Sequence, residues 1–139
     1  MLNTSFKRAI VLFVVVIAPA IWARSASYAQ QAAPAPKRTV LQEHDLPVPG
    51  YQASLVQVDI PVGGREGKHT HPGLALIRVE SGALTLEYEG KPTMTYKAGE
   101  SFVVEPGKIH EGINQGNMPV KAIATFVIEK GKPLASPAK

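Results

Sequence analysis

Residues 69–88 read HTHPGLALIRVESGALTLEY, and this stretch decides the expected fold. Residues 74–79 form a nearly continuous apolar run, which indicates a strand buried on both faces. A Ser-Gly turn at residues 81–82 follows, and in residues 84–88 apolar or aromatic side chains alternate with polar ones. Alternation with a period of two is typical of a strand that buries one face. So short a connection between two strands predicts that they run antiparallel.

The same pattern of short strands and turns extends over the rest of the chain. Val56, Val58 and Ile60 alternate with polar residues and are expected to face a core. Further candidate strands lie at residues 94–96, 102–104 and 120–128. Strands that recur about every 8–12 residues, with no window that carries a helical apolar stripe, predict an all-β sandwich or barrel.

The first 29 residues form a separate unit of sequence. An apolar segment, residues 10–18, follows two basic residues, and small residues stand at the positions before a cleavage site after Ala29. This is the pattern of a secretory signal peptide, so we expect a periplasmic or secreted protein with no stable membrane anchor after cleavage. A membrane anchor is the alternative reading. The apolar stretch spans at most residues 9–23 and contains Pro19, whereas a spanning helix needs about 20 apolar residues.

Composition also sets the limits of the folded domain. Residues 30–38 are rich in Ala and Pro and predict an extended linker, and residues 131–139 resemble a solvated tail. Residues 39–130 then form the single domain. No substantial helix is expected outside the signal peptide.

The charge and the cysteine count exclude several classes of protein. The chain has 139 residues and a formal net charge of +4, but removing the signal peptide leaves 12 basic residues against 11 acidic ones. A nearly neutral domain without a basic run gives no support for binding to nucleic acid. The absence of cysteine excludes a disulfide scaffold, a cysteine-ligated zinc site and a thiol nucleophile.

Three of the four histidines stand where they can meet. His69 and His71 are two residues apart, so their side chains lie on the same side of an extended segment. His110 begins another candidate strand about 40 residues later. Three imidazoles brought together would form a site for a divalent metal with positions open to water or substrate. Two surface histidines are the alternative reading of the pair, and His44 has no such partner.

Two spaced patterns surround these histidines. The first contains, at intervals of five, one, three and six residues, Gly63, His69, His71, Ala75 and Gly82. The second contains Gly99, Glu105, Pro106, Gly107, His110 and Asn114. The two patterns resemble the two motifs of the cupin family, and the stretches His71-Pro72-Gly73 and Phe126 to Leu134 resemble small exported single-domain cupins. The resemblance covers roughly residues 40–134. It implies a jelly-roll β-barrel, also called a double-stranded β-helix, in which His69, His71 and His110 bind a metal.

The sequence departs from the cupin motifs at two positions. The first motif usually supplies a glutamate as the fourth ligand, and here Ala75 stands at that position. In the second motif Glu105 takes the place of a proline, which follows as Pro106. We expect the turn to survive, because Pro-Gly still favours it. Glu105 is either a solvent-facing carboxylate of the turn or a group that turns toward the metal.

Several other residues are candidates for a place near the metal. By parity with His71, we expect Ala75, Ile77 and Val79 to form an apolar wall, and Phe102, Val104, Phe126 and Ile128 are candidates for core or pocket. Arg78 is a candidate for orienting an anionic substrate or for a subunit interface, with an outward-facing position as the alternative. Asn114 is expected to fix a turn. No carboxylate is placed as an obvious general base.

Two classes of function remain open at this point. The first is a metal-dependent enzyme that acts on a small organic molecule by oxygenase-like or isomerase/lyase-type chemistry. The second is a non-catalytic ligand-binding or sensor protein, with or without metal. Imidazole ligands suit zinc, iron, manganese, nickel and copper, so the ion is not assigned. A homodimer is expected from the resemblance to cupins alone.

Overall fold

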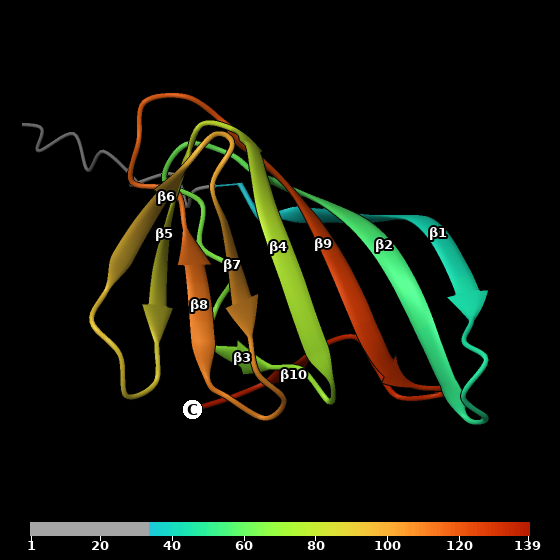
Figure 1. Cartoon of the computed structure of the whole chain (residues 1–139). Coiled ribbons are helices and arrows are strands. Elements are labelled where there is room, and N and C mark those ends of the chain that lie inside the picture. The colour runs from blue at the N-terminus through green and yellow to red at the C-terminus, as the bar shows by residue number, and fades with distance from the viewer. Residues whose placement is uncertain (1–33) are drawn as a thin grey trace, which may run out of the picture. The chain divides into compact units, whose positions relative to one another are not determined.

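The computed structural model describes residues 34–139, in which ten strands form two antiparallel sheets and there is no helix. The first sheet has the order β1-β2-β9-β4-β7. Its strands are β1 (Lys37–Asp45), β2 (Tyr51–Ile60), β9 (Val120–Glu129), β4 (Leu74–Ser81) and β7 (Ser101–Val104). Figure 1 shows that β2, β9 and β4 run side by side as long strands.

The second sheet is built from shorter strands in the order β10-β3-β8-β5-β6. They are β10 (Ser136–Pro137), β3 (His69–Thr70), β8 (His110–Ile113), β5 (Ala83–Tyr88) and β6 (Met94–Lys97). The chain passes from one sheet to the other at the turn between β4 and β5. There Gly82 adopts a φ of +77°, which a residue with a side chain rarely adopts.

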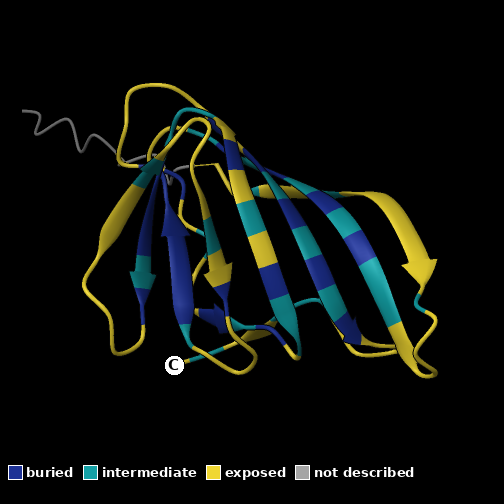
Figure 2. Cartoon of the chain, in the orientation of Figure 1, coloured by how far each residue is buried: buried dark blue, intermediate teal, exposed yellow. Residues whose placement is uncertain are grey.

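The two sheets share one apolar core. Alternate residues of β2 and β9 are buried, as the banding of these strands in Figure 2 shows. Val56 and Ile60 of β2 pack in the same cluster as Leu84 and Leu86 of the opposite sheet. The alternation expected in residues 56–60 and the strand expected at residues 120–128 are therefore confirmed, and so is the all-β, jelly-roll fold class.

One strand prediction is wrong. We expected residues 74–79 to be buried on both faces, but Leu76 of β4 is 46% exposed, whereas Ala75 and Val79 are fully buried. The outer face of this sheet is open to solvent, so an apolar run can occur in a strand with only one covered face. The strand that is buried throughout is β8, whose four residues are all buried.

The ends of the domain also differ from expectation. β1 begins at Lys37, inside the predicted linker, and pairs with β2 although most of its residues are exposed. The sequence of β1 is largely polar, so it gives no alternation signal. His44 lies on this strand and is exposed. The segment predicted as a solvated tail contains β10, which pairs with β3, and Leu134, which packs against the core.

The predicted signal peptide and the cleavage site after Ala29 lie outside the described residues. Within residues 34–139, no helix has the length and apolar character required to span a membrane.

Candidate metal centre

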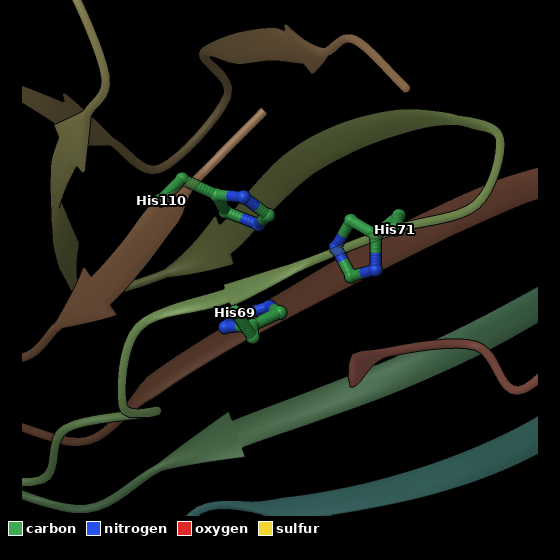
Figure 3. A group of neighbouring side chains, drawn as sticks. All are labelled: His69, His71 and His110. Atoms are coloured by element: carbon green, nitrogen blue, oxygen red, sulfur yellow. The ribbon is translucent and has the colours of Figure 1, made fainter. Parts of the chain in front are cut away.

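β3 and β8 bring the three candidate histidines together. His69 of β3 is the register partner of His110 of β8, and His71 follows two residues after His69. The ring centroids of the three histidines are 4.3 to 4.9 Å apart, and each residue is at most 6% exposed. Figure 3 shows the three rings converging on a common space. The sequence prediction that these residues meet inside the barrel is thus confirmed.

Each of the three rings makes a hydrogen bond from Nδ1 to a backbone carbonyl. His69 donates to Gly67 at 2.8 Å, and His110 donates to Lys108 at 3.0 Å. His71 donates to Leu134 at 2.6 Å. A carbonyl oxygen only accepts hydrogen bonds, so Nδ1 carries the proton in all three rings. In the neutral rings this leaves the lone pair on Nε2, which is the arrangement that orients histidines toward a metal.

The surroundings of His71 and His110 keep these two rings uncharged at neutral pH. Burial lowers the pKa of His71 and of His110 to about 4, against an ordinary value of 6.5. The positive charge of Arg38 and the neighbouring histidines add smaller contributions in the same direction. Because a metal binds only the neutral imidazole, these two rings need no proton release to accept an ion at neutral pH.

The spacing of the donor atoms is close to that of a metal site. One candidate ligand nitrogen from each ring lies within 4.8 Å of the others. Tetrahedral ligands at about 2.1 Å from an ion lie about 3.4 Å apart, so the rings need to close by about 1.4 Å at most. Three buried imidazoles that each direct Nδ1 to a backbone carbonyl therefore fit a divalent transition metal in their donor chemistry.

No carboxylate belongs to this histidine cluster. Ala75, at the position where the cupin motif usually has a glutamate, is fully buried between its register partners Val104 and Phe126. Glu105 is exposed, as expected for a carboxylate on a turn. Within the described residues, the cluster consists of His69, His71 and His110 alone.

The cavity beside the histidines is lined largely by apolar side chains. They come from both sheets and are Val58, Ile60, Ile77, Leu84, Leu86, Phe102, Val104, Ala122, Ala124 and Phe126. Of the expected apolar wall, Ile77 lines the cavity, whereas Ala75 and Val79 belong to the core without lining it. Of the residues that were candidates for core or pocket, Phe102, Val104 and Phe126 line the cavity and Ile128 does not. The cavity has a free volume of about 40 Å³, which is room for a few water molecules.

Two charged residues that the sequence analysis did not select also line this cavity. Arg38 extends from β1, and Glu66 lies in the loop before β3. Arg38 Nη2 donates to Glu66 Oε1 at 2.7 Å. Glu66 could have been selected from the sequence as a candidate for the cavity, because it lies only three residues before His69. The position of Arg38 depends on the pairing of β1 with β2, for which the sequence has no marker.

The remaining candidates lie away from the cavity. Arg78 is exposed and pairs with Glu80 at 3.1 Å, which corresponds to the outward-facing alternative. Asn114 is fully buried, and its amide donates to the carbonyls of Ile60 and Met118. Gly116 donates to Asn114 Oδ1, so Asn114 fixes a turn as expected.

Several solved structures share this fold. An uncharacterised protein with a double-stranded β-helix domain from Klebsiella pneumoniae is 22% identical, with a TM-score of 0.61 over 75% of this chain and 84% of that chain. A cupin superfamily protein from Desulfitobacterium hafniense is 14% identical, with a TM-score of 0.57 over 68% and 78% of the two chains. A recombinant oxalate oxidase in complex with glycolate is 25% identical, with a TM-score of 0.55 over 61% of this chain and 45% of that chain.

The family assignment follows from the sequence as well as from the fold. No curated protein matches the chain. The family described as "Cupin domain" matches residues 56–126, which include all three histidines of the cluster and the whole of five strands that line the cavity, β3, β4, β5, β7 and β8. With this match, and with the double-stranded β-helix neighbours, the chain belongs to the cupin family.

Proposed function

We propose that this cupin holds one divalent transition metal on Nε2 of His69, His71 and His110 and acts on a small organic molecule in the adjoining cavity. The observation that carries the proposal is the set of three Nδ1 hydrogen bonds to the carbonyls of Gly67, Leu134 and Lys108. These bonds leave three unprotonated nitrogens for one ion.

The bound ion would supply Lewis acidity at an open coordination position. Three neutral ligands leave the ion's full double charge in place, which favours binding of an anionic ligand and lowers the pKa of a bound water. The protein's contribution is to orient the rings and to surround the site with apolar side chains that limit water. Zinc, iron, manganese, nickel and copper all accept imidazole ligands.

An enzyme is the first candidate function, with oxygenase-like or isomerase/lyase-type chemistry. The carboxylate of Glu66 lines the same cavity and provides a polar group there besides the histidines. The oxalate oxidase similar to this chain was solved with the small organic acid glycolate, which supports a small organic molecule as the substrate class. A ligand-binding or sensor cupin is the second candidate, since a small apolar cavity also serves to retain a ligand.

Metal analysis tests the proposed site. Wild-type protein, purified without chelators, is expected to carry close to one metal ion per chain, and His110→Ala is expected to lose it. His44→Ala is the matched control, because His44 is an exposed histidine on β1. A metal content that His110→Ala leaves unchanged would refute the three-histidine site.

Oxygen uptake separates the two candidate functions. Protein loaded with ferrous iron is assayed against a panel of enols, thiols and phenols, and His110→Ala serves as the blank. Uptake that depends on one substrate class supports the oxygenase-like enzyme. No uptake and no isomerised or cleaved product from a fully loaded protein would favour the binding role.

Export is also part of the proposed function. Residues 1–29 carry an apolar segment and a cleavage pattern of small residues ending at Ala29, which support a periplasmic or secreted protein. Mass spectrometry of the mature protein from a secreting host is expected to find Gln30 at the N-terminus. An N-terminus at Met1 in the membrane fraction would instead support an anchor.

A further inference from the structure

The ion pair of Arg38 and Glu66 lines the cavity and is not part of the histidine cluster. Arg38 lies opposite Val58 in the pairing of β1 with β2. Directly opposed residues of antiparallel strands project from the same face of a sheet. Val58 is 8% exposed and lines the cavity, so Arg38 is directed to the cavity side as well. Its side chain is still 37% exposed and can therefore be reached by a ligand from solvent.

Glu66 is fixed next to the histidines by a glycine. Its backbone N–H donates to the carbonyl of Gly112 at 3.0 Å, and its carboxylate lies where a side chain on Gly112 would be. Gly112 is two residues from His110 on β8, so both positions face the same side. The carboxylate of Glu66 thus occupies the inward position beside His110, and its side chain is only 12% exposed.

Hydrogen bonds from Arg65 and Gly67 to Glu111 of β8 hold the loop that carries Glu66. Glu111 accepts two hydrogen bonds from Arg65, at 3.0 and 2.7 Å, and one from the backbone N–H of Gly67 at 3.1 Å. Both neighbours of Glu66 are therefore held by one buried carboxylate. This fixes the backbone at Glu66 and restricts where its side chain can place the Arg38 guanidinium.

The guanidinium keeps most of its hydrogen-bonding capacity. Arginine has five N–H donors in a planar fork that matches a carboxylate. Within the described residues, the side chain of Arg38 makes a single hydrogen bond, from Nη2 to Glu66 Oε1. The donors that remain can bind a second anionic group at the cavity without breaking the ion pair.

We propose that Arg38 binds the carboxylate of a small organic acid in this cavity and that Glu66 is the positioning residue that aims the guanidinium. The proposal rests on the proposed function, because it names the substrate class of the same metal site. The apolar lining selects a short hydrocarbon portion beside the carboxylate, and the small free volume limits the ligand to a few heavy atoms.

Calorimetric titration of zinc-loaded protein with propionate and with propionamide tests this proposal. The two probes have nearly the same shape and differ in charge, so preferential binding of propionate measures recognition of the carboxylate. Arg38→Gln is expected to weaken propionate binding about 10- to 100-fold, the range for loss of a charge-assisted hydrogen bond. Glu66→Gln retains an acceptor for Arg38 and removes a negative charge, so propionate is expected to bind at least as tightly as in wild type.

The outer face provides a matched control. Arg78 and Glu80 form an Arg–Glu ion pair of similar type that is remote from the cavity lining, and Arg78→Gln is expected to leave propionate binding unchanged. Equal binding of propionate by Arg38→Gln and by wild type would overturn the proposal. Equal binding of propionate and propionamide by wild type would overturn it as well.

Metal content, measured in every sample, separates this proposal from the proposed function. A wild-type protein that retains no zinc refutes the metal site itself. A protein that retains zinc and binds propionate independently of Arg38 refutes only the role of Arg38, since the carboxylate then binds to the ion alone. Circular dichroism of Arg38→Gln and Glu66→Gln verifies that both variants are folded.

Discussion

His69 lies directly opposite His110 across the β3–β8 pair, and their ring centroids are 4.3 Å apart. The two residues are 41 positions apart in the chain, so their proximity depends on the formation of the second sheet. This cross-strand pair contributes two of the three residues of the histidine cluster, and His71 is the third. The metal site is therefore a product of strand register, and changes that disturb that register or its hydrogen-bonding partners are expected to weaken metal binding.

Removal of the C-terminal segment is expected to weaken metal binding. The carbonyl of Leu134 accepts the 2.6 Å hydrogen bond from His71 Nδ1, and the Leu134 side chain packs against the core. A chain that ends at Lys132 loses this acceptor, and its affinity for zinc is expected to fall about 10- to 100-fold. Competition with a chromophoric chelator measures the change.

A chain that ends at Ala135 is the matched control for this truncation. It keeps the Leu134 carbonyl but loses β10, so a loss of affinity in both truncated chains would assign the effect to the β10–β3 pairing. An unchanged affinity in the chain ending at Lys132 would contradict the role of Leu134.

Acid is expected to destabilise the metal-free protein between about pH 6.5 and pH 4. The pKa of His71 and of His110 is lowered to about 4 in the folded state, by burial first and then by nearby charges that include Arg38 and His69. In the unfolded chain both rings bind protons near pH 6.5, so in this window the unfolded state takes up more protons. The free energy of unfolding therefore falls as the pH is lowered through it.

Urea denaturation at a series of pH values measures this dependence. Glu111 acts in a different window, because its hydrogen bonds to Arg65 lower its pKa below the ordinary value of 4.5. The stability that Glu111 contributes is lost only as the pH falls below that value. A free energy of unfolding that stays constant from pH 6.5 to pH 4.5 would contradict the assignment to the two histidines.

Asn114→Ala is expected to destabilise the fold without changing the metal ligands. The side-chain amide of Asn114 donates to the carbonyls of Ile60 and Met118 at 3.0 and 2.9 Å, and the residue is fully buried. Alanine leaves these carbonyls without that donor, at a cost of about 2–4 kcal/mol in the free energy of unfolding. Chemical denaturation measures the loss. Asn114→Asp is expected to be at least as damaging, since its carboxylate cannot donate.

Two glycines are expected to differ in their tolerance of a methyl group. A Cβ on Gly73 would meet the backbone carbonyl oxygen of Val127 in β9, which cannot move without disturbing the β4–β9 pairing. A Cβ on Gly112 would meet the end of the flexible Glu66 side chain. Gly73→Ala is therefore expected to lower the melting temperature more than Gly112→Ala. The reverse order in thermal unfolding would contradict the close approach at Gly73.

Local patterns in the sequence determined most of the fold. Alternation in residues 56–60 predicted a strand within β2, because period-two burial is a property of the extended chain itself. The candidate strand at residues 120–128 corresponds to β9. The His-x-His spacing and the strand that begins at His110 predicted the histidine cluster, because alternate side chains of an extended chain point to the same side. The prediction that Leu76 is buried was wrong, because an apolar residue in a strand does not reveal whether a second layer covers it.

Tertiary structure alone decided what surrounds the histidines. The polar strand β1 brings Arg38 to the cavity through its register with β2, and the C-terminal segment brings the Leu134 carbonyl to His71. Neither contact is encoded by a local pattern, because each depends on the pairing of segments far apart in the chain. The sequence by itself thus determined the all-β class and the candidate ligands, and its resemblance to the cupin motifs implied the barrel. The long-range pairing of strands determined the charge and the hydrogen-bonding partners of the site.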